Sequence, residues 1–502
     1  MFKSISLKKN TIANYIGQFY NMFIGIAILP AYMVYLGAEA FGLIGFFTML
    51  STWMMLLNVG LSATISRQSA SLKHSFEQMI EFKHILRSVE AVFVVIALVI
   101  VFGIYISDSW IANSWLNIET LDKNEVAYCI SLMGVMISFK WLVGLYKGAI
   151  NGFELQIWLN IYGVIINSLK FVGGFILVKY ISQRPSNYFE YQLVIGALEL
   201  IIIHRKVYKV VPKTDNFIKP SIKYLKIIMP FTLGIAYTSG LWIVLTNIDK
   251  LILSNILPLK EYGYFSLIVV VAAGMSAMAG PIGIAVQPRL TSLLALNRGA
   301  EMIALYKKAT QFVSVIGFAV TGTVAVFSTE FLYAWTGDME AAKWAGHILF
   351  WYALGNGLLM ILAFQYYLQF AYGNLKYHIW GNTLFGFVQI GVMIVVVYSY
   401  GALGAGICWF ALQAIFLSFW PGYIHSKFAK GIHTNWMFQD VLPIIISSIF
   451  ILMVIKNLDI DFFSLQRVEL FFILLLIGGV VLIVNSLVAK DVRNMILKRI
   501  VK

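Results

Sequence analysis

Residues 470–484 read LFFILLLIGGVVLIV, a run without a single charged or strongly polar side chain. With its flanks the run reaches about twenty residues, the length that an α-helix needs to cross the hydrocarbon core of a bilayer. Further apolar runs cover residues 92–106 and 390–397. A transmembrane β-strand would instead alternate apolar and polar residues over about ten positions. These stretches therefore predict membrane-spanning helices.

The whole chain has the composition of a polytopic membrane protein. Of its 502 residues, 60% are hydrophobic and 12% are charged, against roughly 25% charged residues in soluble globular proteins. This is too little charge to cover soluble domains, and disordered chains are poor in apolar residues. Because backbone polar groups inside a bilayer must be satisfied internally, the sequence predicts an all-α polytopic membrane protein.

The apolar runs between breaker residues predict about fourteen transmembrane helices. The sixth and the thirteenth are short, so counts of twelve or thirteen stay open. The predicted helices cover residues 11–35, 41–65, 87–107, 125–147, 155–179, 189–204, 227–255, 262–286, 309–333, 347–370, 379–399, 404–423, 441–456 and 469–489.

The basic residues orient these helices. Of the 37 Lys and Arg residues, 27 fall on one side of the predicted membrane, 7 on the other and 3 inside helices. The positive-inside rule assigns the richer side to the cytoplasm, so both termini are expected there, in a multi-pass protein of the cell (inner) membrane. A nucleic-acid surface would gather basic residues on one folded face. The net charge of +14 therefore indicates orientation, and no nucleic-acid partner is expected.

A basic loop at 204–226 divides the chain. It predicts an N-terminal six-helix lobe (1–203), the loop itself as a basic cytoplasmic linker, a C-terminal six-helix lobe (227–423), and an extra helix pair with a basic cytoplasmic tail (424–502).

Two coincidences suggest that the lobes are repeats. Gly42 and Gly263, each at the start of a predicted helix, are 221 residues apart, and these helices end at Arg67 and Arg289, 222 residues apart. Six helices per unit would make a parallel repeat around an axis along the membrane normal, with a substrate cleft between the lobes. Chance similarity is the alternative.

Enzymatic motifs are absent from the sequence. It contains neither the phosphate-binding G-x-x-x-x-G-K-[ST] nor the zinc-binding H-E-x-x-H, and its seven histidines lack metal-ligand spacing. We therefore expect no enzyme activity, no catalytic residue, no metal site and no cofactor, apart from a coupling ion, H⁺ or Na⁺.

Polar residues inside the predicted spans are the candidate site residues, because a charge at the bilayer centre costs roughly 3 kcal/mol or more and usually serves a function. In the first helix Asn14, Gln18 and Asn21 recur at i, i+4 and i+7, on one helix face. Such a stripe lines either a water-filled cavity or a hydrogen-bonded contact between helices.

Two lysines lie inside the fourth and fifth predicted spans. Lys170 is about 13 Å from the outer boundary, at 1.5 Å per residue, which is further than a lysine side chain comfortably snorkels. We expect it to face a cavity, with snorkelling as the alternative. Lys140 lies in the inner half of its helix, where a cavity and the cytoplasmic interface are both within reach.

The seventh span carries Asp249 and Lys250. Adjacent helical side chains point about 100° apart, so these two are expected not to pair, and each needs its own partner, either in an inter-helix ion pair or in a cavity. Arg67 and Arg289 are either positive-inside anchors or cations at the inner mouth of the cleft.

The intramembrane charge balance is cationic. Three mid-span lysines face one mid-span acid, since Glu90 and Glu199 lie near cytoplasmic helix ends. A cleft of that sign suits an anionic substrate such as a phosphate-bearing lipid, to which Lys and Arg donate charge-assisted hydrogen bonds. It suits a cationic drug poorly.

Several short stretches resemble a known family. TNIDKLILS at 246–254, followed by EYGYFS at 261–266, resembles the seventh-to-eighth helix signature of bacterial polysaccharide flippases. The other matching stretches are YLG at 35–37 with FG at 41–42, NVGL at 58–61, GAINGFE at 148–154 and YGALGA at 400–405.

On these residues the chain is identified as a member of the polysaccharide transporter branch of the multidrug/oligosaccharidyl-lipid/polysaccharide exporter superfamily. The resemblance implies two six-helix bundles that rock between inward- and outward-open states. It also implies a substrate, an O-antigen or capsule oligosaccharide on undecaprenyl pyrophosphate, that moves from the cytoplasmic to the outer leaflet. Membrane lipids, a polysaccharide polymerase and a chain-length regulator are the implied partners. Lys170, Lys250 and Arg289 would then contact anionic groups of the substrate, and the polar stripe of the first helix would line the passage.

Neighbouring branches fit less well. Multidrug and toxin extrusion transporters typically carry an acidic residue in the first helix, and lipid II flippases typically carry an arginine there; residues 11–35 contain neither. A drug or cation antiporter and a lipid II flippase stay open as alternatives. A membrane-embedded polymerase would need catalytic arginines in a large outer loop, and the longest predicted outer loop, 108–124, carries only Lys123.

Overall fold

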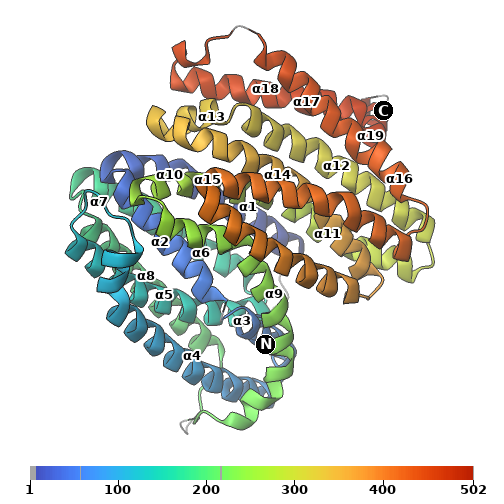
Figure 1. The fold of residues 1–502 in the computed structure, drawn as a ribbon. Helices are drawn as coiled ribbons and strands as arrows, with labels where there is room; N and C mark the ends of the chain where they lie inside the picture. Colours follow the sequence, from blue (N-terminus) through green and yellow to red (C-terminus); the bar gives the residue numbers. More distant parts are fainter. Residues whose placement is uncertain (1–6, 57, 215–217, 459, 501–502) are drawn as a thin grey trace. The chain divides into compact units, whose positions relative to one another are not determined.

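The computed structural model describes residues 7–56, 58–214, 218–458 and 460–500. These residues form helices joined by turns, with one isolated bridge between Asn117 and Pro258. The all-α prediction is confirmed. Figure 1 shows the helices in chain order.

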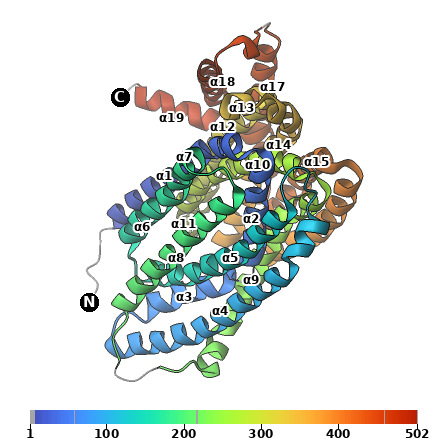
Figure 2. The same cartoon turned by 90° about the vertical axis from the view of Figure 1, so that its left-hand side faces the viewer.

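The chain divides into two units, Met1–Gly263 and Tyr264–Lys502. In the first unit α5 packs against α3, α4 and α8, α1 packs against α6, and α9 packs against α3; α3, α4 and α5 can be followed in Figure 2. Its elements are α1 (Leu7–Leu36), α2 (Ala38–Met55), α3 (Val59–Ser71), α4 (Phe76–Trp110), the π-helical turn η1 (Ile111–Trp115), α5 (Lys123–Gly152), α6 (Gln156–Ser168), the π-helical turn η2 (Leu169–Gly173), α7 (Gly174–Tyr180), α8 (Pro185–Val210) and α9 (Ile222–Ile256).

The second unit begins inside α10 (Leu259–Ala277). The boundary between the units lies after α9 because α9 packs against α2, α3 and α4 of the first unit. The division into lobes at 204–226 follows the sequence repeat and stays a prediction. The remaining elements are α11 (Gly280–Ala295), α12 (Gly299–Val326), α13 (Ser328–Thr336), α14 (Met339–Ala371), α15 (Lys376–Phe428), α16 (His433–Asn435), the π-helical turn η3 (Trp436–Val441), α17 (Leu442–Lys456), the 3₁₀ turn η4 (Phe462–Ser464), α18 (Arg467–Val488) and α19 (Lys490–Ile500).

The predicted linker is shorter than expected. Helix α8 continues to Val210 and α9 starts at Ile222, so only 211–221 connect them. Five of the seven Lys and Arg residues of the predicted linker therefore lie on the two helix ends, three in α8 and two in α9.

Four predicted helices are interrupted. The fifth contains the turn η2, the second is split into α2 and α3, the eighth into α10 and α11, and the ninth into α12 and α13. The second and the eighth break at equivalent positions: Ala38 and Leu259 start the first halves, Val59 and Gly280 the second halves, with an offset of 221 each time. The shared break agrees with the repeat predicted from Gly42 and Gly263.

The number of spans depends on three helices, α8, α9 and α15. Among the described residues, eleven helices are long and apolar enough to cross a membrane, or twelve if the bent helix α9 counts as one span. A count of fourteen also requires α8, and two spans from α15. Gly401 interrupts α15 with a φ of 59°, and its 53 residues would extend about 80 Å against a hydrocarbon core of about 30 Å. Fourteen stays a prediction.

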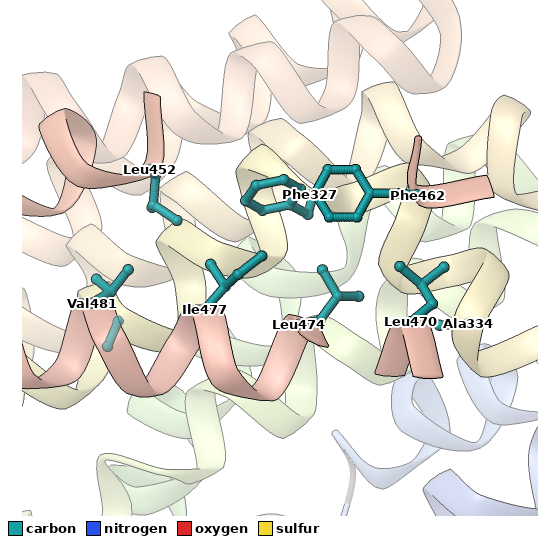
Figure 3. Close-up of a cluster of buried hydrophobic side chains, with 9 residues drawn as sticks. Phe327, Ala334, Leu452, Phe462, Leu470, Leu474, Ile477 and Val481 are labelled. Carbon is teal, nitrogen blue, oxygen red and sulfur yellow. The ribbon is translucent and has the colours of Figure 1, made fainter. Parts of the chain in front are cut away.

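The last two long helices, α17 and α18, pack against the rest of the second unit through an apolar stripe on α18. On α18, residues at i, i+4, i+7 and i+11 face Phe327, Phe462 and Leu452 (Figure 3). The rings of Phe327 and Phe462 meet edge to face with 5.3 Å between centroids. The stripe residues are Leu470, Leu474, Ile477 and Val481.

Truncating Phe327 should loosen this attachment. Phe327 is fully buried, so Phe327→Ala leaves a cavity and should cost about 3–5 kcal/mol, measured as a lower midpoint of thermal unfolding in detergent. Phe472→Ala is the matched control, because Phe472 on α18 is 59% exposed. Equal losses for both variants would contradict the packing argument.

Candidate functional site

Lys170 lies in the π-helical turn η2, inside the fifth predicted span. A π-turn leaves carbonyl groups without their usual helical partners, and such turns are frequent at functional sites. The carbonyl oxygen of Lys170 accepts hydrogen bonds from the Tyr32 hydroxyl at 3.2 Å and from the Gln192 amide at 2.9 Å. Tyr32 also donates to the carbonyl of Phe171 at 2.7 Å, and Tyr191 to that of Leu169 at 2.7 Å. Side chains from α1 and α8 thus hold the turn.

Two glycines make room for these hydroxyls. A Cβ added at Gly173 would collide with the Tyr191 hydroxyl, and one added at Gly174 would come within 2.5 Å of the Tyr32 hydroxyl. The Gly-Gly pair inside an apolar run is therefore the sequence signal for an irregular turn at this point.

The carboxylate of Glu199 on α8 joins two lysines. Its Oε1 lies 2.9 Å from Lys147 Nζ, and its Oε2 pairs with Lys170 Nζ. The Glu199 side chain is 7% exposed, and Tyr162 donates to its backbone carbonyl at 2.9 Å. Lys170 thus has an ionic partner that the sequence argument left out of the mid-span charge balance, because Glu199 lies near a cytoplasmic helix end. The long side chains of Lys170 and Glu199 bridge the distance between them.

Lys140 completes a group that we call the lysine–glutamate cluster, Lys140, Lys147, Lys170 and Glu199. The charges of the other three members act on Lys140, its Nζ lies 6.0 Å from the Phe47 ring centroid, and no ion pair to it is found among the described residues. The cluster carries three cations and one anion. This excess of positive charge can attract an anionic group.

A second buried carboxylate differs in kind. Glu90 accepts hydrogen bonds from the hydroxyls of Tyr146 and Tyr208 at 2.7–2.9 Å and pairs with Arg87 at 3.4 Å. Its one basic partner and two neutral donors satisfy it locally. The lysine–glutamate cluster is therefore the candidate site of this unit.

The polar stripe of α1 is described in part. Asn21 accepts a hydrogen bond from the Asn167 amide at 2.9 Å, which joins α1 to α6. For Asn21 this is the helix-contact alternative. The side chains of Asn14 and Gln18 lie outside the described residues.

Asp249 and Lys250 form an ion pair, so the expectation that they cannot pair was wrong. Lys250 Nζ lies 3.4 Å from Asp249 Oδ1 and also donates to the carbonyl of Thr246. The flexible four-carbon stem of lysine folds back along its own helix, which the angle between Cα–Cβ bonds does not forbid. Both side chains are largely buried, at 5% and 16% exposed.

Arg67 on α3 and Arg289 on α11 are both exposed. They occupy the second halves of the split second and eighth predicted helices. Exposure agrees with either alternative, an anchor or a cation at a cleft mouth, so their role stays a prediction.

Solved structures with a similar fold identify the fold of this chain. The lipid II flippase MurJ in an inward closed conformation has 17% sequence identity and a TM-score of 0.72, covering 97% of this chain and 99% of that one. An inward-facing multidrug resistance MATE transporter of the MOP superfamily has 12% identity and a TM-score of 0.63 over 83% and 96% of the two chains. A MOP superfamily transporter from Pyrococcus furiosus has 14% identity and a TM-score of 0.55 over 84% and 96%. The fold is that of a MOP superfamily transporter.

The family follows from the sequence. The model of the family described as "Polysaccharide biosynthesis protein" matches residues 7–294, more than half of the chain, so the chain belongs to this family. The family resemblance drawn from the short stretches is confirmed. No significant match to a curated protein is found.

Proposed function

We propose that the protein is a flippase that moves an oligosaccharide linked to undecaprenyl pyrophosphate, an O-antigen or capsule repeat unit, from the cytoplasmic to the outer leaflet of the inner membrane by alternating access. The observation that carries the proposal is the lysine–glutamate cluster in a chain of the polysaccharide biosynthesis family. Glu199 balances one of the three lysine charges, which leaves two positive charges. These can donate charge-assisted hydrogen bonds to a pyrophosphate. The proposal includes no enzymatic step.

Residue roles follow from charge and position. Lys140, Lys147 and Lys170 would hold the pyrophosphate, with Glu199 keeping them apart and partly neutralised when the substrate is absent. Lys250 and Arg289 would contact the substrate at other stages, and Arg67 would attract it from the cytoplasm. Membrane lipids would accommodate the undecaprenyl tail, and a polymerase and a chain-length regulator would take over the product.

Lipid II transport is the second candidate. The fold similarity to the lipid II flippase spans nearly both chains, which favours it over a drug antiporter. A multidrug or cation antiporter is supported by fold similarity alone, and a cluster with excess positive charge would repel a cationic drug.

The test is deletion of the gene in its own host, followed by complementation. We expect the deletion to remove surface polysaccharide and to leave lipid-linked oligosaccharide on the inner leaflet, where it is protected from impermeant reagents outside the cell. Complementation with the wild-type gene should restore both. Normal surface polysaccharide with blocked lipid II export would favour the second candidate. Normal polysaccharide with reduced dye efflux would favour the antiporter and overturn the proposal.

A further inference from the structure

Two histidines meet in the interior of the second unit. His425, in the last turn of α15, is fully buried, and His433 in α16 is half-buried. Their Nδ1 atoms lie 3.2 Å apart. A Cβ added at Gly422 would lie 3.2 Å from the His433 ring, so the glycine leaves room for the close approach of the two rings. The short connection between α15 and α16 thus places two imidazoles nitrogen to nitrogen.

A tyrosine and a glutamine extend this contact into a chain of four side chains. His425 Nε2 lies 2.9 Å from the Tyr306 hydroxyl, which accepts a hydrogen bond from the Gln365 amide, also at 2.9 Å. Tyr306 and Gln365 are buried as well. The chain links α12, α14, α15 and α16 through groups that lie away from solvent, where each donor needs an acceptor.

When both histidines are neutral, the hydrogen bonds of these four side chains run from Gln365 towards His433. Because the Tyr306 oxygen accepts from Gln365, its own hydrogen can go to His425 Nε2. His425 then carries its hydrogen on Nδ1 and donates it to Nδ1 of His433, whose hydrogen sits on Nε2. Every contact in the chain then has one donor and one acceptor.

One added proton reverses the part of the chain at Tyr306. The protonated pair has three hydrogens on its four ring nitrogens, and only one of them fits between the two Nδ1 atoms. The other two must therefore lie on the two Nε2 atoms. His425 thus has an Nε2–H whichever ring holds the charge. Tyr306 must then accept from His425 and turn its own O–H to a new acceptor. Gln365 supplies one: its Oε1 is buried and has no partner among the described residues, and rotation of the amide by 180° exchanges oxygen and nitrogen.

The charged side chains near the two histidines have other partners or lie far from them. Lys307 on α12 pairs with Asp440 of η3 at 3.3 Å, and Asp440 also accepts from Gln311. The Asp491 backbone of α19 donates to Gln311, and Lys427 on α15 lies over the Tyr423 ring. On α14 the only charged or imidazole side chains, Glu340, Lys343 and His347, lie in its first nine residues, far along the helix from Gln365. The Trp436 ring closes the pair, with its centroid 5.0 Å from His425 and 6.2 Å from His433.

From this geometry we propose that the His425–His433 pair is the binding site for the proton that is coupled to translocation. The inference rests on the proposed transport function and names its coupling ion. The added proton becomes the Nε2–H of His425, the positive charge is shared with the half-buried His433, and Tyr306 and Gln365 reorient. Four helices that are joined by one hydrogen-bond pattern when the pair is neutral are joined by another when it is charged. Loss of the proton restores the first pattern.

The site can be tested without transport, because an imidazolium quenches the fluorescence of a neighbouring indole. Purified full-length protein in detergent should lose Trp436 fluorescence as pH falls from about 8 to about 3, a scan that extends below the ordinary histidine range because the two imidazoles lie wholly or partly away from solvent. His433→Gln should abolish this transition, Trp436→Phe should remove its signal, and His347→Gln, an exposed histidine of the same unit, should leave it intact. A transition that survives in His433→Gln, or that is absent from the wild type, would overturn the inference.

A second measurement separates this site from the proposed function. Proteoliposomes that contain lipid-linked oligosaccharide should flip it faster under an imposed pH gradient, and His433→Gln should lose this acceleration while binding the oligosaccharide with unchanged affinity. Acceleration that persists in His433→Gln would overturn the proton site alone. If the wild type flips no oligosaccharide but the fluorescence transition is present, the proposed substrate fails and the proton site stands.

Discussion

Lys170→Met should abolish export of surface polysaccharide while the protein still reaches the membrane. The substitution removes the mid-span cation of the lysine–glutamate cluster, whereas Glu199 keeps Lys147 at 2.9 Å. The stability loss should therefore be smaller than the roughly 3–5 kcal/mol expected when a buried charge is left with no partner. Surface polysaccharide in a deletion strain gives the first readout, and the amount of protein in the membrane fraction gives the second. Lys179→Met, at the far end of the same span and exposed, is the matched control and should export normally.

The double variant Lys170→Met/Glu199→Gln separates the two roles that Lys170 could have. Replacing both partners of a buried ion pair is often nearly neutral for stability, and Lys147 is 43% exposed and can be hydrated. If Lys170 contacts the anionic substrate, the double variant folds as well as the wild type and still fails to export. Restored export would mean that Lys170 only balances Glu199, and the substrate assignment would fall.

The partner of Lys170 could not be predicted from helical periodicity. Periodicity gives the face of a helix but not the reach of a side chain, and Lys170 meets Glu199 through two long side chains. The turn η2 also inserts one extra residue, which rotates the remainder of the span after the turn by about 100°. The Gly173-Gly174 pair was the available signal, and the tyrosines that hold the turn come from α1 and α8, far away in sequence.

Length and composition were sufficient for the fold class, and breaker residues for most helix ends. Gly401, with its positive φ, lies between the predicted eleventh and twelfth helices. The breaks inside the second and eighth helices were missed, because the described residues at the breaks, Leu56, Asn58 and Met278–Ala279, are ordinary helix formers or lie beside apolar residues. Tertiary packing overrides local preference there.

A second large effect is expected at Gly42 and Gly263, the two glycines that indicated the repeat. A Cβ added at Gly42 would collide with the carbonyl oxygen of Leu259, and a Cβ added at Gly263 would collide with that of Ala38. All four residues belong to the first unit. Gly263 is the equivalent of Gly42, and Leu259 is the equivalent of Ala38, each 221 positions further along the chain. The two contacts are therefore the same contact made twice, once from each repeat. Such reciprocity is the signature of a two-fold axis.

Gly42→Ala and Gly263→Ala should each destabilise the protein by about 3 kcal/mol or more, because the colliding atoms are backbone and neither helix start can yield without moving the other. The double variant should cost less than the sum of the two, since the first substitution already separates the helices that the second would push apart. The midpoint of thermal unfolding measures both effects. Gel filtration of heated, detergent-solubilised samples detects the protein that is still folded at each temperature. Gly103→Ala in α4 is the control: nothing lies within 4 Å of an added Cβ there, and helix propensity favours alanine by about 1 kcal/mol. If Gly42→Ala were as stable as Gly103→Ala, the two helix starts would not be in backbone contact, and the reciprocal packing would lose its support.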